Sequence, residues 1–338
     1  METESAVTHS DNGQTQTASE TVIQTRGLTK SFATESGEIV AVDDVSFAID
    51  EGTVVGVLGP NGAGKTTTIK MLLGLVRPTS GTASIHGVDV DSASSEIYDY
   101  VSGMLEGARN VYWRLTVREN LRFFSRIGNE PANPDRIERL IAQVGLEEKA
   151  DEPINDLSRG MKQKASIACT LVRNTPTVFL DEPTLGLDVE SSIELRESLK
   201  DLVRRDERTV LVSSHDMEVI QDLCDRVIIM ADGEIIADDT VESLLQSFST
   251  RTLRLTLDAA PPPELRTVLD SRFEVRHGTD TRNRHQLEVV GIDEDGFYEV
   301  FDLIEPAQPT LVEVDTLTPD LEDVFLRVVD EGEVSVDE

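Results

Sequence analysis

The chain has 338 residues, with 64 acidic side chains against 31 basic ones, so its formal net charge at pH 7 is −33. Hydrophobic residues make up 38% of the sequence, which is enough to fill the cores of ordinary domains and excludes a disordered chain. The acidic excess argues against a nucleic-acid partner, because phosphate binding draws on clustered Lys and Arg residues.

No stretch approaches the ~18 consecutive apolar residues of a membrane helix, and the start of the chain lacks a secretory pattern. We therefore expect a soluble, intracellular protein. Cys169 and Cys224 stand in apolar surroundings without a CxxC pattern, which predicts buried thiols rather than a disulfide or a metal site. Only seven of the basic residues are lysines, and scarce Lys in an acidic chain resembles the proteins of salt-accumulating halophiles. A merely acidic, soluble protein is the alternative.

Residues 1 to about 20 are mostly Thr, Ser, Gln and Glu, which predicts a disordered tail. From Thr21 onward, short β-rich runs alternate with helical patterns. Strands are expected at 21–26, 45–50, 53–58, 177–180, 208–214 and 225–230, and helices at 65–73 and 240–248. Strands that alternate with helices predict a layered α/β domain over residues 21–248.

From about residue 90 to 175 the pattern is mainly helical, with candidate helices in TVRENLRFFSRI, NPDRIERLIAQVGL and SRGMKQKASIACTLVRN. This predicts a helical insert within the α/β domain. We expect a domain boundary near Phe248 to Arg251, because a new succession of strands and helices begins there. No internal repeat is found.

The second unit, residues 251–338, has its own pattern. Strands are expected at 251–257, 272–277, 285–290 and 310–316, and helices at 263–270 and 294–304. The order βαββαβ predicts a small α+β domain of the ferredoxin-like type. A last helix follows Pro319, and its apolar face is expected to pack on its own domain.

The most specific motif is GPNGAGKTT, which follows the apolar run TVVGVL and opens a helix. It fits G-x-x-x-x-G-K-[ST], in which backbone N–H groups wrap a phosphate. Lys65 can reach the β- and γ-phosphates, and the Thr66 hydroxyl can bind Mg²⁺. The predicted phosphate-binding residues are Gly59, Pro60, Asn61, Gly62, Ala63, Gly64, Lys65, Thr66 and Thr67.

A second motif, TVFLDEP, delivers two adjacent carboxylates at the end of an expected buried strand. Ligands gather at this edge of open α/β sheets. We expect Asp181 to hold Mg²⁺ through water, and Glu182 to orient or deprotonate the attacking water in phosphoryl transfer. Such a pair alone is more often a solvated turn, and the phosphate loop is what favours the functional interpretation.

Together these motifs resemble an ABC transporter ATP-binding subunit over about residues 21–248. In that family the LSGGQ-like signature of one subunit closes over the ATP held by the other, and LSRGMKQK, with Ser158 and Gly160, stands in its place. The resemblance implies that His215 in SSHDM is the switch histidine, Asp188 in GLD belongs to the D-loop, and Phe32 stacks on adenine. Each residue alone would more often be a helix cap, a surface group or part of a core.

Three positions depart from the family pattern. Glu106 stands where most members have the Gln of the Q-loop, and it is expected to bind Mg²⁺ or water. In the signature, Arg159 replaces a Gly and Met161 replaces a Gln. Arg159 could face phosphate or simply point to solvent.

The resemblance implies an ATPase with ATP and Mg²⁺ as cofactors and with Glu182 and His215 as catalytic residues. One phosphate loop per chain implies a second ATPase subunit, either a copy of this chain or a similar one. The signature, Glu106 and the ending PDLEDVFLRV resemble the branch that drives export of drugs, polysaccharides or lipids through a separate membrane permease, contacted near residues 106–120. The chain would then lie peripherally on the cytoplasmic face of the membrane.

Two other functions stay open. A soluble ABC ATPase of DNA repair or translation would need long coiled coils or two cassettes, and neither is found in this sequence. A regulatory module, in which ATP gates an interaction and turnover is incidental, would suit the βαββαβ unit.

Overall fold

The computed structural model describes residues 20–35, 37–92, 95–106, 110–127, 133–205, 208–247, 251–280, 284–292, 294–305, 310–317 and 320–331. The expected disordered tail, apart from Glu20, lies outside these residues, and so do positions 248–250 at the expected domain boundary. Within the described residues, no helix is both long and apolar enough to cross a membrane.

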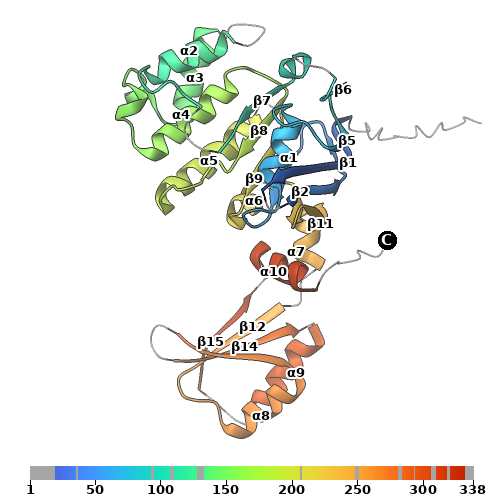
Figure 1. Ribbon diagram of the computed structural model, residues 1–338. Helices are drawn as coiled ribbons and strands as arrows, with labels where there is room; N and C mark the ends of the chain where they lie inside the picture. Colours follow the sequence, from blue (N-terminus) through green and yellow to red (C-terminus); the bar gives the residue numbers. More distant parts are fainter. Residues whose placement is uncertain are drawn as a thin grey trace, which may run out of the picture.

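A six-stranded sheet forms the centre of the first part of the chain (Figure 1). Across the sheet the strands are β11 (Glu234–Thr240), β10 (Arg226–Ala231), β4 (Val54–Leu58), β9 (Thr209–Ser214), β8 (Thr177–Asp181) and β7 (Val101–Met104). All neighbours from β10 to β7 are parallel, and β11 is antiparallel at the edge. Every residue of β4, β8 and β9 is buried, as expected for parallel strands that are covered on both faces.

A second, antiparallel sheet packs on helix α1 (Lys65–Leu72), on the side opposite the central sheet. It contains β2 (Gly37–Val45), β1 (Thr21–Thr34), β5 (Ser80–Ile85) and β6 (Val88–Asp89), and β3 (Ala48–Asp50) pairs with β1. One apolar cluster joins Ile69 and Leu72 of α1 to Val57 of β4 and to Ile23 of β1. This cluster fixes α1 between the two sheets.

The helical insert lies at one end of the central sheet, at the upper left of Figure 1. It contains the helices α2 (Val117–Ser125), α3 (Pro134–Gln143) and α4 (Arg159–Leu171), and the 3₁₀ turns η2 (Glu147–Lys149) and η3 (Ile154–Asp156). The 3₁₀ turn η1 (Glu96–Asp99) lies outside the insert and contacts β6 and β7. The three expected helices are confirmed. The expected helical range from about residue 90 was wrong at one place, because β7 within it belongs to the central sheet and pairs with β8.

Helix α5 (Val189–Arg205) follows β8, and α6 (Met217–Leu223) follows β9. Cys169 and Cys224 are buried free thiols, as expected, and burial raises the pKa of both. Their apolar surroundings are those of the larger core cluster, which also holds most of the helical insert.

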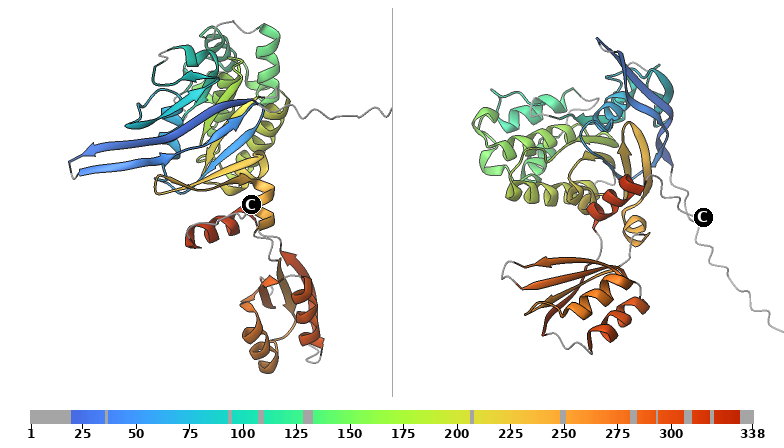
Figure 2. Two further views of the ribbon diagram at one scale, coloured as in Figure 1. Left: turned by 90° about the vertical axis from the view of Figure 1, so that its right-hand side faces the viewer. Right: turned by 60° about the horizontal axis from the view of Figure 1, so that its bottom comes forward.

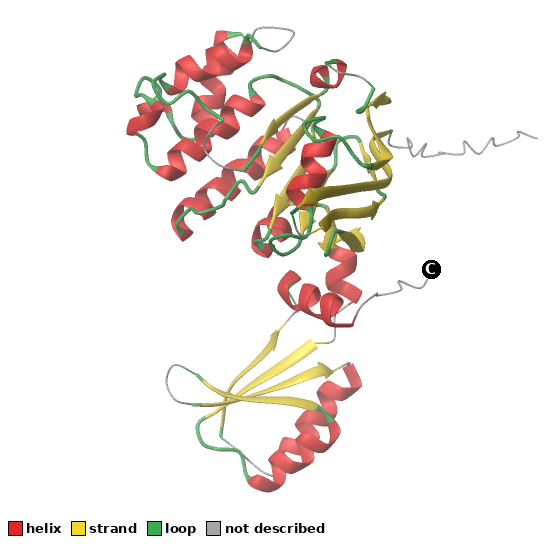
Figure 3. Cartoon of the chain, viewed as in Figure 1, coloured by secondary structure: helices red, strands yellow, loops and turns green. Residues whose placement is uncertain are grey.

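After α7 (Val241–Ser247) the chain forms a separate four-stranded sheet with helices on one face (Figure 3). Its elements are β12 (Arg251–Leu257), α8 (Pro263–Arg272), β13 (Glu274–Thr279), β14 (His285–Ile292), α9 (Glu294–Ile304) and β15 (Leu311–Leu317). The strands lie in the order β13-β14-β12-β15, and all pairs are antiparallel. This sheet and its two helices have an apolar core of their own, which includes Leu255, Leu269 and Val300.

The last helix, α10 (Leu321–Glu331), returns to the first part of the chain (Figure 2). Its buried residues Leu321, Val324 and Val328 belong to the same core cluster as Leu223 of α6 and Leu244 of α7. The expectation that this helix packs on its own domain was therefore wrong. The spacing of its apolar residues gives one apolar face, and α6, α7 and β11 supply the surface that covers it.

Candidate active site

The predicted phosphate loop joins β4 to α1 at the carboxyl edge of the central sheet. Gly62 and Gly64 have φ angles of 92° and 100°, which favour glycine. A Cβ atom on Gly64 would lie 2.6 Å from the carbonyl oxygen of Ala41, and one on Gly59 would lie 2.3 Å from that of Met230. The loop therefore requires glycine at these positions, both for its backbone shape and for its close approach to neighbouring strands.

A cleft of about 530 Å³ opens over this loop. It is lined by residues 60–67 together with Ala41, Glu106, Glu182 and Leu185. Lys65 is the one cation among these lining residues. Its side chain is buried, and its Nζ donates to the carbonyl oxygens of Gly59 at 2.6 Å and Pro60 at 3.1 Å.

Asp181 and Thr66 meet at the base of the cleft. The Thr66 hydroxyl donates to Oδ1 of the fully buried Asp181 at 3.0 Å, and the Ser213 hydroxyl donates to the same oxygen at 2.6 Å. The backbone N–H of Glu106 lies 3.4 Å from the other oxygen, Oδ2. Hydroxyl and carboxylate oxygens are ligands that Mg²⁺ prefers, so this donor set fits the expected ion.

Glu182 lies between a cation and an imidazole. Its Oε1 is 3.5 Å from Nζ of Lys65, and its Oε2 is 2.8 Å from Nδ1 of His215. The Glu182 side chain is only 7% exposed. Its φ of 50° is unusual for a residue other than glycine, and its backbone N–H donates to the carbonyl oxygen of Ser213 at 3.0 Å. The turn after β8 therefore aims this carboxylate into the cleft.

Ser213 is a site residue that the sequence analysis missed. It is the last residue but one of β9, which pairs in register with β8, so Ser213 stands directly beside Asp181. Its hydroxyl contacts Asp181, and its carbonyl oxygen holds the backbone of Glu182. Its place near the end of an expected strand, two residues before His215, was the available signal.

Phe32 does not line the cleft among the residues described. It lies on β1, the residue is 41% exposed, and Nζ of Lys30 is 5.0 Å from the ring centroid. The partner strand β2 does reach the cleft, because Ala41 is one of the lining residues. His215 does not line the cleft either, but it contacts Glu182, which does.

Ser158, Gly160 and Asp188 form a second group, away from the cleft. Ser158 caps α4, with its hydroxyl accepting from the N–H of Met161 at 3.3 Å. Asp188 accepts from both the N–H and the hydroxyl of Ser191 at 2.9 Å, and these bonds lower its pKa. A Cβ atom on Gly160 would lie 3.0 Å from the Ser191 hydroxyl, so the two helix starts are in close contact.

Arg159 points neither into the cleft nor only to solvent. Its Nη2 donates to the carbonyl oxygen of Leu185 at 3.3 Å. Its side chain also lies close to Gly186, where a Cβ atom would collide with the guanidinium. This Arg therefore joins the start of α4 to the loop after Glu182.

Known proteins match the first part of the chain, which we call the cassette. Residues 42–185 match the ABC transporter family. The chain is 38% identical over 220 residues to the ABC transporter ATP-binding protein NatA of Bacillus subtilis (strain 168), covering 64% of this chain and 89% of NatA. It is 39% identical over 213 residues to the Nod factor export ATP-binding protein I of Burkholderia orbicola (strain AU 1054), covering 62% and 69% of the two chains.

A solved structure of an ATP-binding cassette has the same fold as this part of the chain. The dimeric post-hydrolysis state of the ATP-binding cassette MJ0796, bound to ADP and Pi, matches with a TM-score of 0.59 and 27% identity. The match covers 64% of this chain and 98% of that cassette.

Proposed function

Because the chain belongs to the family of ABC transporter ATP-binding proteins, we propose that it hydrolyses ATP with Mg²⁺ to power export through a separate membrane permease. The observation that carries the proposal is the position of Glu182. This carboxylate lies beside the phosphate loop, between Lys65 and His215. Exporters among the relatives, such as the Nod factor export protein, support the direction of transport.

In this proposal the loop at 59–67 binds the phosphates of ATP. The backbone N–H groups and the start of α1 favour an anion there, and Lys65 supplies a positive charge. Thr66 and Asp181 hold Mg²⁺, with Glu106 close by. When bound, the ion neutralises charge on the β- and γ-phosphate oxygens. Phe32 is proposed to stack on the adenine, and β2 links it to the cleft.

Glu182 is the proposed base. Its Oε1 is held by Lys65 and its Oε2 by His215, so the carboxylate has a fixed direction and can orient or deprotonate a water molecule at the γ-phosphate. His215 is 43% exposed and can adjust to the presence of phosphate while it holds Glu182. The turns after β8 and β9 hold the side chains of these two residues in position at the cleft.

A second subunit is proposed to complete the site. Ser158, Gly160 and Asp188 do not line the cleft of their own chain, and they lie where α4 and α5 begin. Exposed N–H groups at a helix start favour an anion. We therefore assign these residues to the ATP that is bound by the partner, in a homodimer or a pair with a similar chain.

The permease is proposed to dock on the helical insert. Tyr112, Trp113, Phe123 and Ile127 are exposed there by 51%, 51%, 38% and 56%, and we call these four residues the aromatic patch. Aromatic residues make up only 4% of the chain, and Trp113 is its one tryptophan. Such a cluster of exposed apolar side chains is typical of an interaction site. It also overlaps the expected contact region at 106–120, and it would hold the chain at the cytoplasmic face of the membrane.

Residues 251–317 are proposed to form an accessory domain of the ferredoxin-like type. The succession βαββαβ, the strand order and the separate apolar core support this assignment. Replacing residues 251–317 by a short Gly/Ser linker, with α10 retained, should leave the ATP affinity unchanged, because every nucleotide motif lies before this unit. A well-folded variant that no longer binds ATP would contradict the domain division.

The transport function can be tested with the membrane protein encoded next to this gene. We expect that protein to have several membrane spans, to co-purify with this chain and to raise its ATPase rate. The variant Glu182→Gln should still co-purify but show no stimulated hydrolysis. A chain that hydrolyses ATP but neither binds nor responds to the permease would instead support a soluble ATPase.

A further inference from the structure

Helix α4 contacts the loop that follows the proposed base. Two of its side chains, Arg159 and Gln163, are four residues apart and therefore lie on the same face of the helix. Nε2 of the buried Gln163 donates to the carbonyl oxygen of Pro183 at 2.7 Å. Nη2 of Arg159 donates to the carbonyl oxygen of Leu185 at 3.3 Å. One face of α4 thus holds two alternate carbonyl groups of the segment between Glu182 and α5.

The same segment bonds its remaining carbonyl groups internally. Glu182 has a φ of 50°, a left-handed conformation that costs free energy and persists only where neighbouring groups hold the backbone. Its carbonyl oxygen accepts from the N–H of Leu185 at 3.2 Å, and that of Thr184 accepts from the N–H of Leu187 at 3.1 Å. The loop therefore satisfies the carbonyl groups of 182 and 184, and α4 satisfies those of 183 and 185. The contacts from α4 complete the set of bonds that hold the backbone after the base.

Helix α4 is itself held in place, so it can support the loop. Lys164 forms an ion pair with Glu194 of α5, with 2.7 Å between Nζ and Oε2. Ala165 and Ala168 are buried in the same core cluster as Leu180 of β8, the strand that leads to the base. The helix and this strand therefore pack as one unit, and the two donors of α4 have fixed positions beside the loop.

Arg159 makes a contact that the usual residue of the signature cannot make. The family pattern has Gly at this position, and Gly has no side chain that could donate a hydrogen bond. In this chain the guanidinium occupies the space beside Gly186, where a Cβ atom would collide with it. Gly186 also has a φ of 71°, which favours glycine. The glycine in the loop therefore leaves the room that Arg159 uses.

We propose that Arg159 and Gln163 are positioning residues for ATP hydrolysis, which hold the loop at 183–187 and thereby the direction of the Glu182 carboxylate. This inference rests on the proposed function, because it needs Glu182 as the base. Neither Arg159 nor Gln163 is among the described residues that line the cleft of their own chain, so their removal should affect the rate and not the ATP affinity. A base displaced by about 1 Å can lose on the order of 100-fold in rate, so a small movement of the loop is measurable.

The test measures kcat and KM for ATP hydrolysis by the complete chain. Gln163→Ala leaves a buried carbonyl group without its donor, so kcat should fall about 10-fold while KM changes by less than about twofold. Arg159→Ala should lower kcat by about threefold, because its contact is longer and more exposed. Arg159→Lys keeps a donor on a long side chain and should restore part of the rate.

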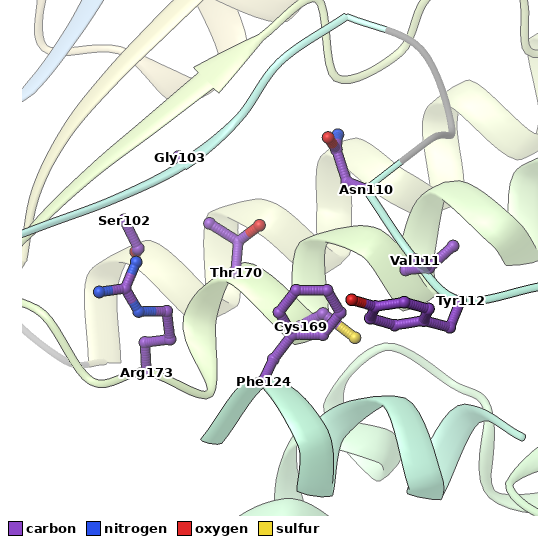
Figure 4. Close-up of a pocket in the computed structure, with 9 residues that line it drawn as sticks. All are labelled: Ser102, Gly103, Asn110, Val111, Tyr112, Phe124, Cys169, Thr170 and Arg173. Carbon is purple, nitrogen blue, oxygen red and sulfur yellow. The ribbon is translucent and has the colours of Figure 1, made fainter. Parts of the chain in front are cut away.

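Thr170→Ala is the matched control on the same helix. Thr170 is as buried as Gln163, but it lines a cavity of about 380 Å³ near the other end of α4 (Figure 4). Its hydroxyl donates to the carbonyl oxygen of Ser166 within the helix at 3.0 Å. The variant removes a buried polar group from α4 without touching the loop, so kcat should stay at the parental value.

A double-mutant cycle with Glu182→Gln separates positioning from a general loss of structure. If Gln163 acts through the base, Gln163→Ala should not lower the residual turnover of Glu182→Gln any further. Equal losses with and without the base would show that Gln163 acts on the fold instead, and would overturn its positioning role. Arg159 is exposed, so Arg159→Ala should fold even if Gln163→Ala does not, and the same cycle applies to it.

Two further results would overturn the proposal. One is a parental kcat for both Gln163→Ala and Arg159→Ala. The other is a rise of KM by more than about 10-fold in Arg159→Ala with kcat unchanged, which would mean that Arg159 binds the ATP held by the partner.

Failure of the proposed function gives a different result. If Glu182→Gln hydrolyses ATP at the parental rate, Glu182 is not the base, and the positioning role fails with it. If Glu182→Gln is slow and the two α4 variants are as fast as the parent, only the positioning role fails.

Discussion

Lys65 contacts the loop that it is expected to serve, and it also contacts Glu182, the proposed base. Lys65→Ala should raise the Kd for ATP by at least about 30-fold, because a buried cation is removed from an anion site. Lys70→Ala, in the last turn of the same helix, is the matched control and should bind ATP normally. Isothermal titration with ATP measures both, and equal affinities would remove the phosphate-loop assignment.

Glu182→Gln keeps the shape of the side chain but removes its charge. We expect turnover to fall by at least about 100-fold, as for the loss of a positioned base, while ATP affinity is retained. The variant should also accumulate as an ATP-bound dimer in size-exclusion chromatography. Glu190→Gln, an exposed carboxylate on α5, is the control. Hydrolysis by Glu182→Gln at the parental rate would exclude the base assignment.

Some residues of the candidate site could be predicted from the sequence, and others could not. The phosphate loop and the adjacent Asp181 and Glu182 are contiguous motifs with fixed chemistry, so their place at one sheet edge could be predicted. Ser213 could not, because its contact with Asp181 depends on the register of β8 against β9. The position of Phe32 outside the described lining of the cleft could not be predicted either, because it depends on the length and pairing of β1 and β2.

At the level of elements, the helices and the buried parallel strands were the most predictable. Strand β7 was missed because it has only four residues and stands among helical patterns, so its membership of the sheet comes from pairing with β8. Strands β2, β5 and β6 were also missed, because they are short or largely exposed and have little apolar periodicity. Helix α10 was predicted, but not its partner, since an apolar face does not indicate which surface covers it.

The contact of α10 with α6 and α7 should contribute to the stability of the ATPase part. Leu321 is fully buried, and its backbone N–H is bonded to Gln221 of α6. Leu321→Ala should lower the free energy of unfolding by about 2–4 kcal/mol. Leu326→Ala on the same helix should cost much less, because that side chain is 54% exposed. Denaturant unfolding followed at the nucleotide site measures this effect, and equal losses for the two variants would contradict the packing role.

At the scale of the whole molecule, the net charge of −33 dominates, and two copies would double it. Surface carboxylates repel over distances near the Debye length, about 10 Å at 0.1 M salt and 3 Å at 1 M. Each exposed pair contributes at most about 1 kcal/mol, so the effect is a sum over the surface and not the property of one residue.

We therefore predict that stability and dimer closure increase with salt. The unfolding temperature and the ATPase rate should both be higher in 2 M KCl than in 0.1 M KCl. Sucrose at matched viscosity is the control for effects unrelated to charge. Equal values at both salt concentrations would show that the acidity is ordinary, and the proposed halophilic origin would be withdrawn.

The packing of α7 against α10 also has an evolutionary consequence. The chain leaves the cassette through one of these helices and comes back through the other, so the four-stranded sheet is inserted between two neighbouring points of a single surface. A unit attached in this way can be gained, lost or exchanged by recombination without a change in the cassette core. Relatives with the same cassette can therefore differ in this unit.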